Sequence, residues 1–254
     1  MEWVLVANKG VDFVRESVSR ILVWGVYSSI SLLLSIWLAW HALAQANFLY
    51  PVWYSLLDIE QTVETFAPKN QFKPQFQFTE PGEHKRLFAE IVSAVQNNGD
   101  GLLNIYYLDQ QGKPIEKFLT AEEVTHLQDV ANLIHYLNRF SLLLMIACLL
   151  LLAGIYLFQV IMPSMKKIML SVLACVIIVS LVVVLLGAQD VFYWLHTKIF
   201  PAEHQWFFYY EESLMSTLMK APVLFAPISL LLILCGIVIW CVHLLLLKKL
   251  ALFK

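Results

Sequence analysis

The chain has 254 residues, of which 59% are hydrophobic and only 14% are charged, and its formal net charge at pH 7 is −2. Its mean hydropathy is +0.69. Soluble domains are nearer half apolar and a quarter charged. This composition therefore excludes an ordinary soluble enzyme, an intrinsically disordered protein and a nucleic-acid-binding protein, and it favours an integral membrane protein.

Four apolar stretches of the sequence are long enough to cross a bilayer, which takes about 20 residues in helical form. They are residues 21–44, 141–161, 168–187 and 223–247, and none of them contains Lys, Arg, Asp or Glu. The first stretch is too long for the core of a signal peptide, so we expect it to be a retained helix. The sequence thus predicts an α-helical membrane protein with four transmembrane helices.

The charges of the connecting segments predict the orientation of these helices. The arm 1–20, the loop 162–167 and the tail 248–254 together carry eight Lys and Arg against three Asp and Glu. The segments 45–140 and 188–222 carry nine against sixteen. Short basic segments stay in the cytoplasm. We therefore expect both termini to be cytoplasmic, in the cytoplasmic (inner) membrane, and the two acidic segments to be extracytoplasmic.

The longer outer segment, residues 45–140, is large enough for a small domain between the first two helices. Polar and aromatic residues alternate at 74–78, which is the period of a half-buried strand. Apolar residues in 84–96 recur at helical spacing and predict a helix. The segments 104–108 and 114–119 flank a short turn, which is typical of a β-hairpin. The sequence therefore predicts a small α+β domain.

A helix that follows the hairpin carries the first candidate site residue. Thr120 and Glu123 fit a capping box, which predicts a helix that runs to about residue 138 and can continue into the second span. His126 lies at the edge between the apolar and polar faces of this helix, and Asp129 follows on the same face. Asp129 would accept a hydrogen bond from His126 and so fix its tautomer. The alternative is an unremarkable pair of surface residues.

The shorter outer segment, residues 188–222, is dense in aromatic residues. Most of these suit an interfacial belt at the level of the lipid headgroups. A belt does not require His196, which is followed by Phe200 and Pro201. We interpret the segment as an interfacial or re-entrant helix along the outer leaflet, which would hold His196 at the depth of the lipid esters.

The remaining histidines outside this segment are expected to be structural or solvated. His84 would be exposed on its predicted helix, and His135 would face away from His126. His41 and His243 lie near the ends of their spans, where neutral interface anchoring is the simplest explanation. These positions leave His126 and His196 as the histidines of chemical interest.

Two outward histidines from distant segments suit an acyl transfer without a cofactor. The sequence lacks a G-x-S-x-G elbow, an H-E-x-x-H motif, a glycine-rich phosphate loop and a C-x-x-C pair. One neutral histidine can take a proton from an attacking amine, and the other can donate to the developing oxyanion. Asp129 and Asp190 are the candidate orienting acids. A metal site is an alternative, although no compact ligand motif supports it; its ligands would be His126, Asp129, His196 and His204.

Two motifs carry a family resemblance. The run EVTHLQDV at 123–130 resembles the E-x-x-H-(M/L)-x-D-V signature of a family of small multi-span membrane proteins, the lipoprotein intramolecular transacylase family. A second family signature is similar to residues that precede and enter the last span; they are Phe192, His196, Phe200, Trp206, Pro222 and Phe225. The two motifs occur in the same order and on the same predicted side of the membrane.

The resemblance implies transfer of the sn-2 acyl chain of a diacylglyceryl lipoprotein to the α-amino group of its N-terminal cysteine. It implies that His126 and His196 are the catalytic pair. We take His126 as the general base, although the residues leave open which histidine has which role. The supporting residues would be Asp129, Glu123 and Asp190, and the candidate substrate contacts would be Phe192, Phe200 and Trp206.

The partners expected on this reading are a diacylated lipoprotein and membrane lipids, without nucleic acid, metal or another cofactor. Two other hypotheses remain. One is a non-catalytic protein whose outer domain docks an envelope complex, and the other is a metal-dependent lipid hydrolase that acts outside the membrane. The sequence does not indicate an oligomeric state.

Overall fold

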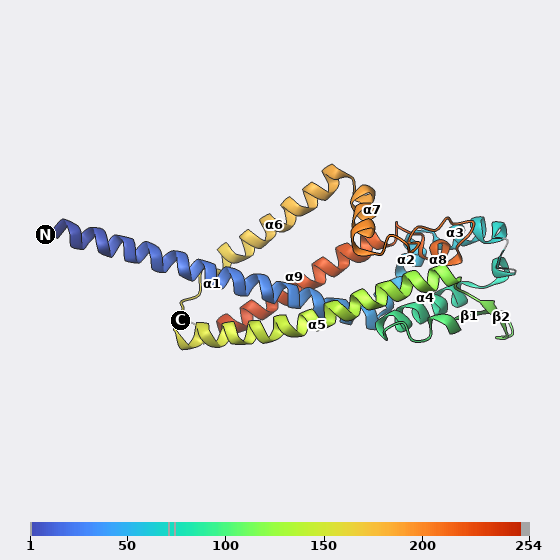
Figure 1. Ribbon diagram of the computed structural model, residues 1–254, viewed down its shortest axis with the longest axis horizontal. Coiled ribbons are helices and arrows are strands. Elements are labelled where there is room, and N and C mark those ends of the chain that lie inside the picture. Colours follow the sequence, from blue (N-terminus) through green and yellow to red (C-terminus); the bar gives the residue numbers. More distant parts are fainter. Residues whose placement is uncertain (1, 71, 74, 250–254) are drawn as a thin grey trace. The chain divides into compact units, whose positions relative to one another are not determined.

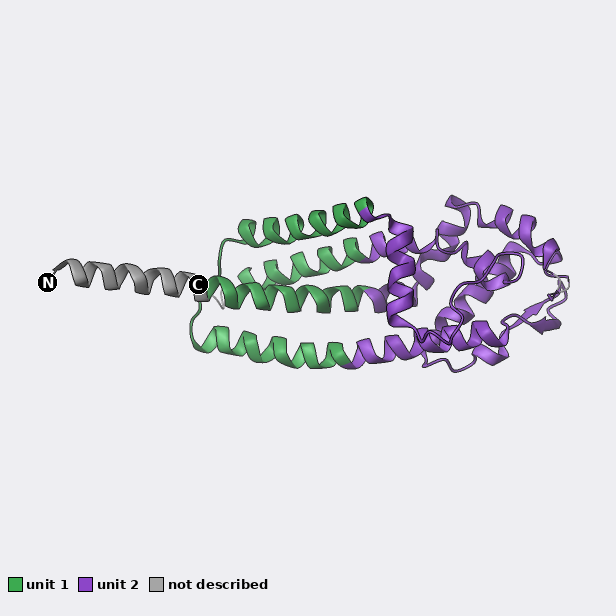
Figure 2. Cartoon of the chain, turned by 45° about the horizontal axis from the view of Figure 1, so that its top comes forward, with its two compact units in different colours: residues 1–39, 140–185, 233–254 green, residues 40–139, 186–232 purple. Residues whose placement is uncertain are grey.

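The computed structural model describes residues 2–70, 72, 73 and 75–249, with side chains from residue 20 onward. This part of the chain is mostly helical and forms two compact units, drawn in Figure 2. The first unit comprises the segments up to residue 39, 140–185 and from 233. The second comprises 40–139 and 186–232. The residues singled out above for acyl transfer all belong to the second unit.

Within the described residues, four helices are long and apolar enough to cross a membrane. They are α1 (Glu2–Gln45), α5 (Ala121–Leu157), α6 (Met165–Leu186) and α9 (Phe225–Lys249), labelled in Figure 1. The prediction of a mostly helical chain with four apolar helices of membrane-spanning length is therefore confirmed. Helix α5 is continuous from the outer segment, and it ends at Leu157, short of the predicted end at 161. Gln159 has a positive φ of 50°, a conformation that stops a helix.

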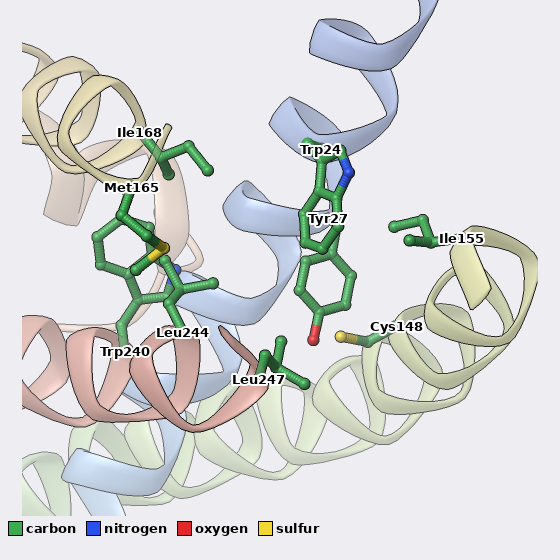
Figure 3. Close-up of a cluster of buried hydrophobic side chains, with 9 residues drawn as sticks. All are labelled: Trp24, Tyr27, Cys148, Ile155, Met165, Ile168, Trp240, Leu244 and Leu247. Atoms are coloured by element: carbon green, nitrogen blue, oxygen red, sulfur yellow. The ribbon is translucent and has the colours of Figure 1, made fainter. Parts of the chain in front are cut away.

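The first unit is held by large side chains that point inward from its helices, as Figure 3 shows. Indole and hydroxyl groups among them find partners inside the unit. Trp240 Nε1 lies 3.2 Å from the Ser28 carbonyl oxygen, and Tyr27 Oη lies 2.8 Å from His243 Nε2. His243 thus contacts another helix of its unit instead of serving only as an interface anchor. Such pairing is required because lipid offers no hydrogen-bond partners.

The second unit contains short helices around one hairpin. Its main elements are α2 (Tyr50–Leu56), α3 (Ile59–Phe66), α4 (Pro81–Gln96), β1 (Tyr106–Leu108), β2 (Pro114–Lys117), α7 (Ala188–Ile199) and α8 (Leu214–Met219). Strands β1 and β2 pair antiparallel, as the hairpin pattern predicted. Helix α4 confirms the predicted helix and begins earlier, because Pro81 at the first turn has the fixed φ that a helix start favours.

The predicted strand at 74–78 is wrong. Phe76–Phe78 forms a 3-10 turn, η3, that follows Gln75 in the left-handed region with φ of 65°. Phe76 is fully buried, whereas Phe78 is 67% exposed, so the alternating residues do not share one buried face. Residue 74 lies outside the described residues. A period of two predicts a strand only where a neighbouring strand can pair with it.

The prediction that His84 is exposed is also wrong. His84 is only 3% exposed, because it shares the buried face of α4 with Leu87 and Phe88. Its Nδ1 lies 2.7 Å from Tyr54 Oη, and its Nε2 lies 2.9 Å from Thr79 Oγ1. Burial lowers the pKa of His84 to about 4, so the ring is neutral in the folded state at pH 7.

This burial makes the stability of the second unit depend on pH. His84 has a folded pKa of about 4 and an unfolded pKa near 6.5, so the unfolded state binds more protons between these values. When the pH is lowered from 7 to 5, the free energy of unfolding of the wild type is expected to fall by about 2 kcal/mol more than that of His84→Gln. Unfolding of both proteins in detergent at the two pH values measures this difference. Equal pH dependence of the two proteins would contradict it.

Candidate functional site

The site begins at the first turn of α5, where the predicted capping box is present. The Thr120 backbone N–H donates to Glu123 Oε2 at 2.7 Å, and the Glu123 N–H donates to Thr120 Oγ1 at 3.2 Å. Glu123 is 1% exposed, and its other oxygen, Oε1, accepts from Ser213 Oγ. Burial raises the pKa of Glu123, while these hydrogen bonds oppose the change. Glu123 therefore ties the start of α5 to the second outer segment and does not contact the histidines through a hydrogen bond.

His126 and His196 come together in the second unit. His126 lies on α5 and His196 on α7, and their ring centroids are 6.2 Å apart. A ring nitrogen lies only about 1 Å from its centroid, so no ring orientation brings the nitrogens within the roughly 3 Å that a hydrogen bond needs. The two rings face each other without bonding. The gap can be bridged by the reacting atoms of a bound ligand.

Aromatic rings enclose this pair. Phe192 lies 4.0 Å from His196 between ring centroids, and Trp206 lies 5.0 Å from it. Phe200 contacts both histidines, at 5.0 Å from His126 and 5.2 Å from His196. The three residues predicted to contact substrate therefore all surround the imidazoles. Their rings remove water from the pair and strengthen any electrostatic interaction there.

One hydrogen bond sets the tautomer of His196. Its Nδ1 lies 2.8 Å from the carbonyl oxygen of Phe192, one helical turn earlier. A carbonyl can only accept, so Nδ1 carries the hydrogen, and in the neutral ring Nε2 has a free lone pair. Burial lowers the pKa of His196, and the Phe192 hydrogen bond opposes this. At pH 7, His196 is therefore a neutral ring with Nε2 available as a base.

His126 has the opposite arrangement. It lies near the start of α5, well before the apolar stretch that begins at Ser141. Its Nδ1 is buried with no hydrogen-bond partner among the described residues. A buried N–H without a partner is costlier than a buried lone pair, which favours the hydrogen on Nε2. Burial first, and then the neighbouring His196, lower the pKa of His126 to about 4, while Asp129 opposes the change.

Asp129 does not form the predicted hydrogen bond with His126. Its Oδ2 lies 2.6 Å from Nδ1 of His204, and the carboxylate affects His126 only through its charge. The second outer segment brings His204 to Asp129, a contact that spacing along α5 could not reveal. Asp190 also differs from the prediction: it is exposed in the first turn of α7, where its carboxylate lies beside Gly187.

The sequence did not predict the place of two residues of the site. Phe208 lies 6.1 Å from His126 between ring centroids, and His204, named above only as a possible metal ligand, forms a hydrogen bond with Asp129. Both lie in a run of aromatic and polar residues in which no period shows which side chains face inward. Among the described residues, no group of three or more His, Cys, Asp or Glu side chains is placed to hold a metal ion. The alternative metal site therefore gains no support from the geometry.

Comparison with known proteins agrees with the two motifs. A sequence profile described as lipoprotein intramolecular transacylase Lit matches residues 25–221. The chain belongs to the Lit family. Its fold is similar to that of a variant of the membrane-integral lipoprotein intramolecular transacylase Lit from Bacillus cereus, with a TM-score of 0.61 and 18% identity over 97% of this chain and all of that one. No curated protein matches the chain. Lit-family membership and the four apolar helices together identify a membrane protein.

Removing the hydrogen bond between Glu123 and Ser213 is expected to lower the stability of the protein. Ser213→Ala removes the donor to a buried carboxylate and also the cap of α8, since Ser213 Oγ accepts from the Ser216 N–H. We expect a loss of about 2–4 kcal/mol in the free energy of unfolding. The control is Thr125→Ala, which removes an exposed hydroxyl from the same helix as Glu123. Denaturant titration in detergent measures the free energy of unfolding of both variants. Similar losses in Ser213→Ala and Thr125→Ala would show that the hydrogen bond between Ser213 and Glu123 adds little stability.

Proposed function

We propose that this Lit-family protein is an intramolecular acyltransferase. It moves the sn-2 acyl chain of a diacylglyceryl lipoprotein to the α-amino group of the N-terminal cysteine. The observation that carries the proposal is the pair His126 and His196, which face each other across an unbonded gap inside an aromatic enclosure. Family membership supports a lipoprotein substrate and a membrane environment.

The tautomers support a definite division of roles, opposite to the one we took from the sequence. His196 acts as the base through Nε2, because its Nδ1 hydrogen is held by the Phe192 carbonyl. His126 acts as the donor through Nε2–H, because its buried Nδ1 has no partner among the described residues. A lowered pKa suits a donor that must stay neutral at pH 7.

The reaction balances without any other reactant. The amine nitrogen attacks the carbonyl carbon of the sn-2 ester, and a C–N bond forms while negative charge develops on the carbonyl oxygen. His126 donates to that oxygen, and His196 takes the proton from the attacking nitrogen. The intermediate then breaks its C–O bond, and the proton passes to the departing sn-2 oxygen. The products are an amide and a free hydroxyl group within one molecule.

The geometry supplies three known sources of rate. The ester and the amine belong to one substrate, so their proximity lowers the entropic barrier. A general base typically contributes about 10²–10⁴-fold. A positioned donor to the oxyanion contributes about 10²–10³-fold. The aromatic enclosure excludes water, so the contributions of the base and of the oxyanion donor are larger than they would be at an open surface.

Exposed aromatic residues beside the site support its place at the outer membrane interface. Trp194 on α7 is 59% exposed, and Phe207 and Tyr209 in the following loop are 43% and 62% exposed. Such side chains favour the level of the headgroups. We therefore propose that α7 lies along the outer leaflet of the cytoplasmic membrane, with both chain termini on the cytoplasmic side.

Replacing either histidine is expected to abolish the modification. His126→Ala and His196→Ala should each lower transfer at least about 100-fold, and the double variant should lose little more, because the two act as a unit. The measurement is mass spectrometry of lipoprotein N-termini in cells that express each variant at wild-type level, with fragmentation to locate the acyl chain.

The matched control is His135→Ala, a half-buried histidine on the same helix whose solvent-facing ring bonds to Asn98 outside the site. It should transfer normally. Full modification by His126→Ala and His196→Ala would instead favour a non-catalytic envelope protein. A wild type that leaves lipoprotein N-termini unchanged would overturn the proposal.

The fall of kcat/KM at low pH should be governed mainly by protonation of the substrate amine, with little contribution from the two histidines. The free substrate amine has an ordinary pKa near 8 and must lose its proton to attack, which gives a slope of one in log(kcat/KM) below that pH. His126 has a pKa of about 4 and stays neutral through pH 6, and burial lowers the pKa of His196 from its ordinary value. The slope between pH 7.5 and 6 should therefore stay closer to one than two histidines of ordinary pKa would allow.

The test uses purified protein and a synthetic diacylated lipopeptide, and activity must recover fully on return to pH 7.5. Histidines with the ordinary pKa of about 6.5 would steepen the slope between pH 7 and 6. Such a steepening would show that the pair is not held neutral by burial.

A further inference from the structure

An extended segment after α7 covers the two histidines. We name residues 204–210 the strap. They have no helix or strand partner, yet their exposure alternates strictly. His204, Trp206, Phe208 and Tyr210 are half-buried, and the three residues between them are exposed. This is the period of an extended chain with one face against the protein.

The inward face of the strap lies on the catalytic pair. Trp206 contacts His196 at 5.0 Å between ring centroids, and Phe208 contacts His126 at 6.1 Å. These two rings belong to neighbouring inward positions, so one segment covers both imidazoles at once. The burial of the histidines, which keeps them neutral, therefore depends partly on where the strap lies.

Side chains hold each end of the strap. At one end, the His204 Nδ1–H donates to Asp129, which lies three residues after His126 and so on the same face of α5. At the other end, Tyr210 Oη donates to the Ala221 carbonyl, and Thr217 Oγ1 donates to the Tyr210 carbonyl. The hydrogen bond between His204 and Asp129 is the anchor that fixes the strap to α5, the helix that carries His126. Its loss would free the end of the strap nearest Trp206.

Water is the competing nucleophile at this site. If water attacks the sn-2 ester carbon, the same C–O bond breaks, and the products are a free fatty acid and a lipoprotein with a free amine and a free hydroxyl. The site must favour the amine of the substrate over a solvent present at far higher concentration. Exclusion of water from closed sites is a general way to prevent such side reactions.

We propose that the strap is a water shield, and that the hydrogen bond from His204 to Asp129 is the positioning contact that keeps it over the two histidines. The inference rests on the proposed acyl transfer. It adds a role in the choice between transfer and hydrolysis, and it assigns that role to two residues that do not contact the reacting atoms.

The test is the product ratio of purified full-length protein with a synthetic diacylglyceryl lipopeptide. Transfer leaves the mass of the lipopeptide unchanged, whereas hydrolysis removes the acyl chain, so mass spectrometry separates the two products. His204→Leu and Asp129→Ala break the anchor from opposite sides. Each should raise the ratio of hydrolysis to transfer about tenfold or more, since a hydrogen bond to a charged group typically contributes at least a tenfold factor.

Two further variants distinguish positioning from general damage. His204→Asn keeps a donor near the position of Nδ1 and should restore a ratio close to wild type. Glu203→Ala changes an exposed neighbour outside the strap and should leave the ratio unchanged. If His204→Leu fails to fold, Phe208→Ala opens the shield without touching the anchor and should raise the ratio in the same way.

The outcomes separate the two proposals. A wild type that gives neither product overturns the acyl transfer and this inference with it. A wild type that transfers, with anchor variants that lose activity at an unchanged product ratio, leaves the acyl transfer standing and overturns the water shield. A raised ratio in both anchor variants, restored in His204→Asn, supports the shield.

Discussion

The proposed chemistry depends on one arrangement: two neutral imidazoles that lie close together in an apolar enclosure without bonding to each other. A histidine in water spends part of its time charged near neutral pH, and an exposed pair would bind water instead of a substrate. Burial removes both problems at His126 and His196. The gap between their rings, 6.2 Å between centroids, is too wide for a direct hydrogen bond. Complementary chemistry is therefore ready at the two rings before a ligand arrives.

Polar contacts outside the pair keep this arrangement in place. The second outer segment has little regular structure between α7 and α8, so it cannot be positioned by a helix or sheet ladder. Glu123 and Asp129, both from the first three turns of α5, hold that segment at Ser213 and His204. The acidic residues of the family motif thus organise the segment that carries the other histidine.

Local patterns predicted the elements well, because their causes are local. Apolar runs indicated the four long helices, and the Thr120–Glu123 box and the hairpin follow from neighbouring residues. His84 and the residues around Phe76 were misjudged because their environment is supplied by distant side chains such as Tyr54. The partner of Asp129 was missed for the same reason. The proximity of the two histidines came from the paired motifs, since no spacing rule relates α5 to α7.

The most direct measurement is ¹⁵N NMR of histidine-labelled protein at pH 7, with the two signals assigned by their loss in His126→Asn and His196→Asn. We expect two neutral rings of opposite tautomer, with hydrogen on Nε2 of His126 and on Nδ1 of His196. A charged imidazolium at either position, or hydrogen on Nε2 of His196, would leave the pair without the base and donor that the reaction needs.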